Sequence, residues 1–159
     1  MMNSSKQLSL TELLAQVSKW KSLGEKIVFT NGCFDVFHAG HAFILNTAKT
    51  FGTKLIVGLN SDNSVTNLKG TSRPINKEQQ RVYVLSSLES VDAIIAFDDA
   101  TPLEILKAIQ PDVLVKGGDY VAENIVGAKE VLANGGKVEI VPLVDGLSSS
   151  KIIAGLKSE

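Results

Sequence analysis

The stretch KIVFTNGCFDVFHAGH, residues 26–41, contains the beginning of an α/β fold in one continuous run. Its first five residues are mostly apolar and β-branched, which predicts a buried strand over 26–30. A loop follows, in which Gly32 would let the backbone come close to a ligand. His38 and His41 then stand three residues apart at the start of a predicted helix. This order predicts a strand, a loop and a helix, with both histidines of the chain at the junction.

The rest of the chain repeats this alternation of strands and helices. Short apolar segments predict four more strands, over 54–60, 91–97, 112–116 and 137–142. Capping and stop signals predict helices that start after Ser9, Asn76 and Thr101, run over about 124–134, and start near Ser148. Residues 61–76 form a polar stretch without a strong period, so no regular element is predicted there.

The strands read as continuous apolar runs, which is typical of strands covered on both faces. Together with the alternation, this predicts a single Rossmann-like, doubly wound α/β domain with a five-stranded parallel sheet. We expect one domain over 1–159, with an N-terminal helix in 1–23 and the core in 24–156. In such folds ligands bind at the carboxyl ends of the strands, where the strand order reverses.

Composition narrows the classes of function. The chain has 159 residues, is 44% hydrophobic and carries a net charge of −1, with no basic stripe of the kind that binds nucleic acid. It shows no apolar run long enough to cross a membrane and no signal peptide. One cysteine excludes an intrachain disulfide framework. These features predict a soluble cytoplasmic protein.

The two histidines suggest a phosphate site. At positions i and i+3 of a helix start, both rings can face one way, beside free N–H groups and the positive end of the helix dipole. The chain lacks the GxGxxG and GxxxxGK[ST] fingerprints, which disfavours a dinucleotide-dependent oxidoreductase and a P-loop NTPase. Two alternatives stay open: a chance pairing of histidines, or zinc held by Cys33, His38 and His41. Cys33 could instead pack at the strand end or contribute only its backbone, and no other metal cage is visible.

Two separated motifs resemble the HxGH nucleotidyltransferase superfamily, which includes cytidylyltransferases and pantetheine-phosphate adenylyltransferase. HAGH lies at 38–41, and SSSKII, from Ser148, resembles the superfamily's S-S/T-x-x-I phosphate motif. The runs FTNGCFDVFHAGH, VGLNSD, LKGTSRPIN, PDVLVKGGDY and DGLSSSKII resemble one group in particular, the heptose-1-phosphate adenylyltransferases. This resemblance covers about residues 24–156. The family often carries a fused sugar kinase, so the length of the chain predicts a stand-alone transferase with a separately encoded heptose kinase.

The resemblance implies a set of nucleotide-binding residues at the strand ends. His38 and His41 would contact the triphosphate in the transition state, with Gly40 between them. The loop after the first strand would contribute Thr30, Asn31, Gly32 and Phe34, and Asp35 would hold Mg²⁺ or orient a neighbour, or form an Asx turn. The loop after the fourth strand would contribute Lys116, Gly117, Gly118 and Asp119, where Lys116 pairs with a phosphate or with Asp119. The last helix would contribute the hydroxyls and amides of Ser148, Ser149 and Ser150, and Ser148 can also be a plain N-cap.

Five further polar residues lie outside the HAGH and SSSKII motifs. By resemblance, Lys69 lies on a mobile flap and reaches the phosphates, although the sequence alone favours a solvated lysine. Arg81 resembles a family arginine near the α-phosphate and the sugar phosphate, whereas Arg73 is expected at the surface. Asn60 and Asp62 would bind sugar hydroxyls or form turns.

The implied reaction is adenylyl transfer from ATP to D-glycero-β-D-manno-heptose 1-phosphate, giving ADP-heptose and pyrophosphate for lipopolysaccharide core synthesis. Mg²⁺ is expected with the ATP, and a homodimer is common in similar enzymes. The alternatives are a cytidylyltransferase acting on glycerol 3-phosphate or a similar ester, and a non-catalytic nucleotide-binding module.

Overall fold

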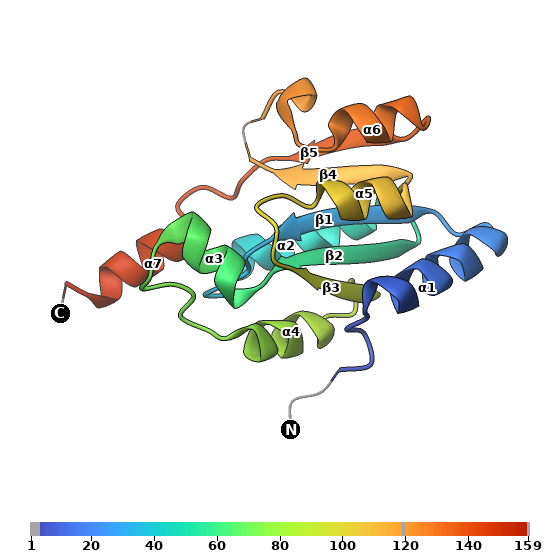
Figure 1. The fold of residues 1–159 in the computed structure, drawn as a ribbon. Helices are drawn as coiled ribbons and strands as arrows, with labels where there is room; N and C mark the ends of the chain where they lie inside the picture. Colours follow the sequence, from blue (N-terminus) through green and yellow to red (C-terminus); the bar gives the residue numbers. More distant parts are fainter. Residues whose placement is uncertain (1–3, 119, 159) are drawn as a thin grey trace.

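The computed structural model describes residues 4–118 and 120–158 and confirms the predicted parallel α/β fold (Figure 1). Five parallel strands form one sheet in the order β3-β2-β1-β4-β5. The strands are β1 (Ile27–Gly32), β2 (Lys54–Asn60), β3 (Ala93–Phe97), β4 (Val113–Gly117) and β5 (Lys137–Val141). The helices are α1 (Leu10–Ser22), α2 (Ala39–Lys49), α3 (Asp62–Lys69), α4 (Glu78–Ser86), α5 (Leu103–Ile109), α6 (Ala128–Ala133) and α7 (Ser149–Leu156), with the short 3₁₀ turn η1 (Ala122–Asn124). No helix in these two ranges is long and apolar enough to cross a membrane.

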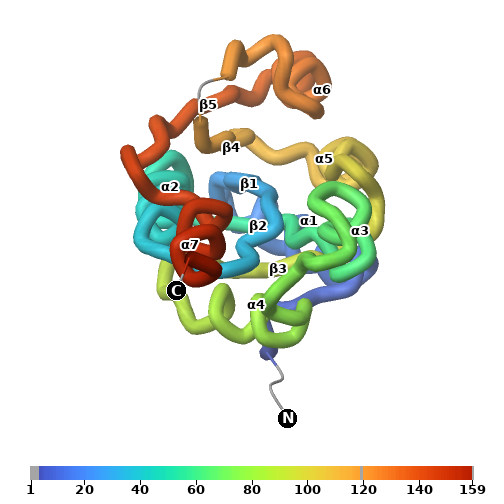
Figure 2. Tube along the Cα trace, turned by 90° about the vertical axis from the view of Figure 1, so that its left-hand side faces the viewer, coloured from blue at the N-terminus to red at the C-terminus, as the bar shows by residue number. Residues whose placement is uncertain are grey.

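Helices cover both faces of the sheet, as the doubly wound prediction requires (Figure 2). On one face Leu13 of α1 and Leu106 of α5 pack into a cluster with Phe29 of β1. On the other face Leu45 of α2 and Leu85 of α4 pack into a second cluster. Burial of these two apolar layers is the main favourable contribution to folding.

The strand order reverses next to β1. From β1 the chain moves outward through β2 and β3 on one side, then returns to place β4 and β5 on the other side. The carboxyl ends of β1 and β4 therefore border the crevice where ligands bind in folds of this kind.

Helix starts follow local capping chemistry, with small shifts from the prediction. The box formed by Ser9 and Glu12 is confirmed, since each side chain bonds the other's backbone N–H. The capping box predicted at Asn76 is not formed, because the Asn76 N–H is donated to Asp35. The helix starts one residue later, with Lys77 as its N-cap, and the Gln80 side chain accepts the Lys77 N–H. The N-cap predicted at Thr101 is Pro102 instead.

Two predicted segments differ more. The polar stretch 61–76, predicted to be irregular, contains α3, which starts where the Ser61 hydroxyl accepts the Ser64 N–H. Lys69 therefore ends a helix rather than lying in an irregular segment. The helix predicted over 124–134 begins only at Ala128, because Gly127 adopts a left-handed φ of 86°. A Cβ at Gly127 would also lie 2.2 Å from a methyl of Leu106.

Candidate active site

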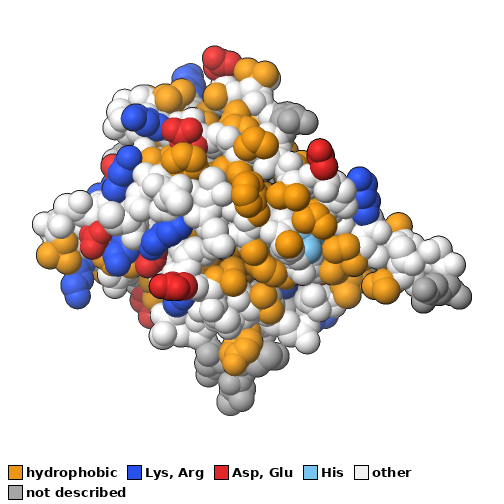
Figure 3. Space-filling model, turned by 180° about the vertical axis from the view of Figure 1, so that it is seen from behind, with side chains coloured by type: hydrophobic (Ala, Val, Ile, Leu, Met, Phe, Trp, Pro, Cys, Tyr) orange, Lys and Arg blue, Asp and Glu red, His pale blue; other side chains and the backbone are white. Residues whose placement is uncertain are grey.

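A pocket of about 280 Å³ opens where β1 and β4 end and where α2 and α7 begin. We call it the histidine pocket. It gathers most of the predicted site residues from four separate parts of the chain. Those that line it are Thr30, Asn31, Gly32, Phe34, Asp35, His38, Gly40, His41, Lys69, Lys116, Gly117, Ser148, Ser149 and Ser150. Seen from behind, hydrophobic side chains gather around an exposed histidine surface (Figure 3).

The two histidines cap the helix that follows them. His38 is the N-cap of α2, and its Nδ1 accepts the Gly40 N–H at 3.1 Å. In return, the His41 Nδ1 accepts the His38 N–H at 3.4 Å. The rings stack with their centroids 3.9 Å apart. Because each Nδ1 is an acceptor, each neutral ring carries its proton on Nε2, the atom that remains available to a ligand.

The surroundings keep both rings neutral. Burial, together with the neighbouring charges of His38 and Lys69, lowers the pKa of His41 to about 4. Burial also lowers the pKa of His38. The pair therefore offers two neutral N–H donors at pH 7, and these can bind phosphate oxygens at the amino end of α2.

Close packing fixes the direction of these donors. The ring of Phe34 meets His41 edge-on at 5.2 Å, and Phe37 lies 5.4 Å from it. Gly40 leaves space for the His38 ring, since a Cβ there would lie 2.9 Å from its Cε1 atom. The glycine of HAGH therefore has a steric role rather than a conformational one.

The start of α7 brings three serines to the same pocket. The Ser148 hydroxyl accepts the Lys151 N–H, which confirms it as the N-cap. Ser149 donates to the Val36 carbonyl at 3.2 Å and so joins α7 to the loop after β1. Ser150 is exposed at the pocket. The pocket thus lies between the amino ends of two helices, both of which favour an anion.

Lys116 contributes the cation at the end of β4. Burial lowers its pKa, and its Nζ lies 5.7 Å from the centre of the Tyr120 ring. Gly117 lets Ile44 approach, since a Cβ would lie 2.6 Å from its terminal carbon. Gly118 adopts a φ of 124° and lies outside the histidine pocket. The predicted partner Asp119 lies outside the described residues.

The structure gives Arg81 a different place from the predicted one. Its side chain is fully buried in α4, and all of its nitrogens are already bonded. It donates to the carbonyls of Cys33, Asn60 and Asn76 and to the carboxylate of Asp62. These bonds use four of its five N–H groups, and through them Arg81 holds the ends of β1 and β2 together. Cys33 thus contributes its backbone carbonyl, one of the two roles predicted for it.

The predicted sugar ligands are also used internally. The buried Asn60 amide donates to Ser64, and Asp62 accepts the Glu78 N–H as well as Arg81. Asn60 ends β2 and Asp62 begins α3, so both lie at the turn between these elements, which corresponds to the turn alternative. Neither lines the histidine pocket.

Arg73, expected at the surface, is paired with the most buried carboxylate of the site. The Asp35 side chain accepts from Arg73 Nε at 2.7 Å and from the N–H groups of Ile75 and Asn76. Burial alone would raise the Asp35 pKa, but these bonds and the arginine charge leave it lowered. Asp35 therefore orients its neighbours, with both oxygens occupied, and fastens the segment after α3 to the loop after β1.

Metal-binding side chains do not gather at the site. Within the described ranges, no three His, Cys, Asp or Glu residues lie close enough to hold an ion. The zinc alternative built on Cys33, His38 and His41 is therefore not formed.

Comparison with known proteins gives a consistent family. A family model described as cytidylyltransferase-like matches residues 29–155. The bifunctional protein HldE of Koribacter versatilis is 52% identical over 148 residues, which are 93% of this chain and 30% of that protein. HldE of Hyphomonas neptunium is 54% identical over 147 residues, which are 92% of this chain and 30% of that protein. The chain thus spans under a third of the length of these curated relatives.

A solved structure agrees with the fold and the family. A lipopolysaccharide core biosynthesis protein from Thermoplasma volcanium GSS1 superposes with a TM-score of 0.58 and 26% identity. The match covers 76% of this chain and 98% of that one.

Proposed function

The chain belongs to the cytidylyltransferase-like family of nucleotidyltransferases, and from this premise we propose that it transfers the adenylyl group of ATP to D-glycero-β-D-manno-heptose 1-phosphate. The products would be ADP-heptose and pyrophosphate, in the synthesis of lipopolysaccharide core precursors. The adenine and the heptose rest on the resemblance of LKGTSRPIN, PDVLVKGGDY and DGLSSSKII to heptose-1-phosphate adenylyltransferases. The name of the Thermoplasma neighbour supports the same pathway.

One observation supports the chemistry most directly. The Nε2 donors of His38 and His41, the helix start at Ser148 and the Lys116 cation all face one pocket. These are groups that bind and neutralise a polyphosphate. A nucleotidyl transfer to a phosphate monoester needs no more than this, because the phosphate dianion is already a nucleophile.

The proposed step is a single displacement. An oxygen of the sugar phosphate forms a bond to the α-phosphorus, and the bond from that phosphorus to the α,β-bridging oxygen breaks. Pyrophosphate leaves with the electron pair. His38 and His41 donate hydrogen bonds to the triphosphate as negative charge moves onto the leaving group, and the amides and hydroxyls at Ser149 and Ser150 bind its outer phosphates.

Mg²⁺ is proposed to arrive with ATP rather than to occupy a protein cage. The predicted ligand Asp35 uses both of its oxygens within the protein. The ion would supply further neutralisation of the phosphate charge. Lys69, exposed at the end of α3 and lining the pocket, is the remaining cation positioned to meet the phosphates.

Three further predictions accompany this function: a cytoplasmic site of action, a homodimer, and a heptose kinase that supplies the sugar phosphate. Size-exclusion chromatography with light scattering tests the dimer. Coupling the reaction to a separately produced heptose kinase tests the supply of substrate.

Pyrophosphate release, measured across a panel of sugar phosphates with ATP and with CTP, tests the function itself. We expect turnover with heptose 1-phosphate and ATP. A clear preference for CTP and glycerol 3-phosphate would support the cytidylyltransferase alternative instead. A His41→Ala variant addresses the non-catalytic alternative: we expect turnover to fall about 100-fold or more while ATP binding weakens much less.

A further inference from the structure

A second pocket, of about 180 Å³, lies beside the histidine pocket at the carboxyl end of the sheet. Asn31 at the end of β1 and Lys116 at the end of β4 line both pockets, so these two residues form the boundary between them. The rest of its lining comes from the loop after β3 and from the segment around η1: Ala100, Thr101, Pro102, Tyr120, Asn124, Ile125 and Val126. The two pockets lie on opposite faces of the sheet, since α2 borders the first and α5 follows the loop of the second.

The second pocket carries unused hydrogen-bonding capacity. Across the described part of the chain, the side chains of Asn31, Thr101 and Asn124 make no hydrogen bond to another residue. They offer two amides and a hydroxyl, which both donate and accept. Such a set matches a ligand with several hydroxyl groups.

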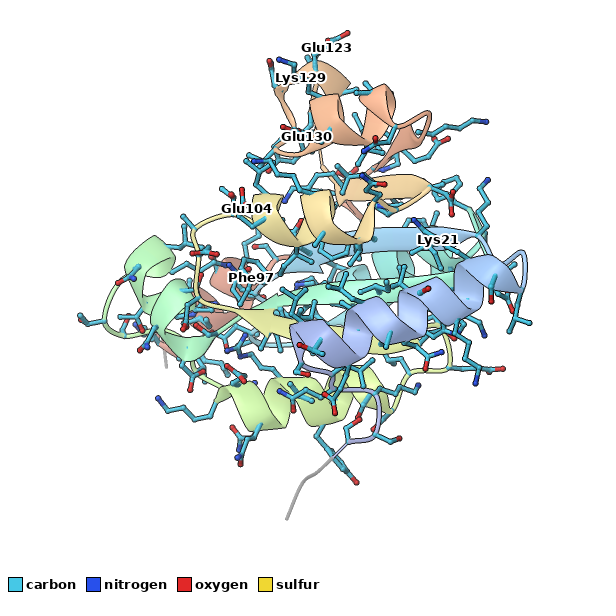
Figure 4. All side chains as sticks on the ribbon, turned by 45° about the vertical axis from the view of Figure 1, so that its right-hand side comes forward. Lys21, Phe97, Glu104, Glu123, Lys129 and Glu130 are labelled. Carbon is cyan, nitrogen blue, oxygen red and sulfur yellow. The ribbon has the colours of Figure 1, made fainter. Side chains whose placement is uncertain are left out.

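Its other walls are apolar or cationic. Buried Pro102 and Ile125 and the exposed Val126 give surfaces suited to the C–H faces of a sugar ring. No described residue that lines the pocket is acidic. Glu123, next to the lining residue Asn124, lies at the outer tip of the η1–α6 region, away from the strands (Figure 4). Among the described lining residues, Lys116 is the charged one, and it lies at the boundary.

The lining of the two pockets separates the two substrates. The second pocket is smaller than the histidine pocket, about 180 against 280 Å³, and its amides and hydroxyl suit a sugar rather than a polyphosphate. The histidine pocket already contains phosphate-binding groups together with Leu143, Val144 and Leu147, which can cover a base. The groups suited to the phosphates of the nucleotide thus lie in the histidine pocket rather than in the second pocket.

We propose that the second pocket is the sugar subsite. In this arrangement Asn31, Thr101 and Asn124 bind sugar hydroxyls, and Lys116 holds the 1-phosphate at the boundary, facing the α-phosphorus. This inference rests on the proposed function and replaces Asn60 and Asp62, whose side chains are used within the fold. Lys116 touches both substrates, whereas Thr101 and Asn124 determine which sugar is accepted.

Two substitutions test the subsite: Thr101→Val, which removes only the hydroxyl, and Asn124→Leu. We expect each to raise the KM for the sugar phosphate about 3- to 10-fold, as for one lost hydrogen bond, with the KM for ATP unchanged. Their matched controls are Thr50→Val, at the far end of α2, and Asn134→Leu, between α6 and β5, both distant from the two pockets. The controls should keep both KM values.

The outcomes separate this inference from the proposed function. An unchanged KM for the sugar phosphate in both Thr101→Val and Asn124→Leu, with wild-type turnover intact, would overturn the subsite alone. A rise in the KM for ATP instead would place the base in the second pocket and also overturn it. A wild-type protein that releases no pyrophosphate with any sugar phosphate of the panel would defeat the function itself. Melting temperatures of all four variants show whether each is folded.

Discussion

His38 and His41 each accept a backbone N–H through Nδ1, and their rings stack 3.9 Å apart. The same atoms that cap α2 thereby direct the two Nε2–H groups into the pocket. In each ring Nδ1 caps the helix and Nε2 is available to a ligand. Substitutions can therefore remove the capping role or the ligand-binding role separately.

Replacing His38 by two different amides should separate these roles. His38→Asn places an acceptor near the position of Nδ1 and is a strong N-cap, so we expect stability within about 1 kcal/mol of wild type. It lacks the distant donor, so turnover should fall about 100-fold. His38→Gln keeps a donor at the distance of Nε2 but caps poorly, and should lose stability while retaining more turnover. Urea unfolding and pyrophosphate release measure the two effects, and equal losses of turnover in both variants would contradict the separation.

Gly40→Ala should damage the site without unfolding the helix. Alanine in a helix is ordinarily favoured over glycine by up to about 1 kcal/mol. Here the new Cβ would lie 2.9 Å from the His38 ring and force it aside. We expect kcat to fall tenfold or more, as for a misplaced donor, with little change in the unfolding midpoint. Gly155→Ala, in open space on α7, is the matched control and should leave kcat unchanged. Wild-type kcat in Gly40→Ala would show that the ring tolerates the Cβ.

Arg81→Lys should act mainly on stability. A lysine keeps the charge but cannot reach the four oxygen atoms that Arg81 bonds, so several buried carbonyls lose their partner. We expect a loss of about 2–4 kcal/mol in the free energy of unfolding. Thermal and urea unfolding measure it. A variant with wild-type stability and strongly reduced turnover would instead indicate that Arg81 contacts the substrate.

Stability should depend on the protonation of His41. Its pKa is about 4 in the folded chain and near 6.5 when unfolded, so the unfolded state binds the proton first as the pH falls. The neutral ring makes its full contribution to the free energy of unfolding above pH 6.5. This contribution is lost progressively as the pH falls toward 4. The free energies of unfolding of wild type and His41→Gln, measured by urea titration at several pH values, should therefore converge between pH 6.5 and 4. A constant difference between the two proteins would show that His41 does not titrate as described.

The sequence predicted the features that depend on local pattern. Strand periodicity placed all five strands within about two residues, and HAGH and SSSK predicted the two helix starts that form the histidine pocket. The helix α3 was missed because it buries only Ser64 and Val65, so it has almost no apolar period, although Ser61 and Asp62 carry a capping signal.

Partners far apart in the chain account for the other differences. Arg81 is bonded by carbonyls 48 and 21 residues away, and Arg73 reaches Asp35 across 38 residues. Neither pairing can be predicted from the residues that neighbour the arginines in the sequence. The second pocket is similar, since Asn31, Thr101 and Asn124 come from the end of β1, the loop after β3 and η1.

The boundary that Asn31 and Lys116 form between the two pockets has a stereochemical consequence. In the proposed arrangement, a sugar phosphate that approaches from one face of the sheet would attack the α-phosphorus opposite the departing pyrophosphate, which would lie toward the other face. One such displacement inverts the configuration at phosphorus. ATP made chiral at the α-phosphorus with sulfur should therefore yield a nucleotide sugar of a single, inverted configuration, whereas retention would require a covalent intermediate on the protein.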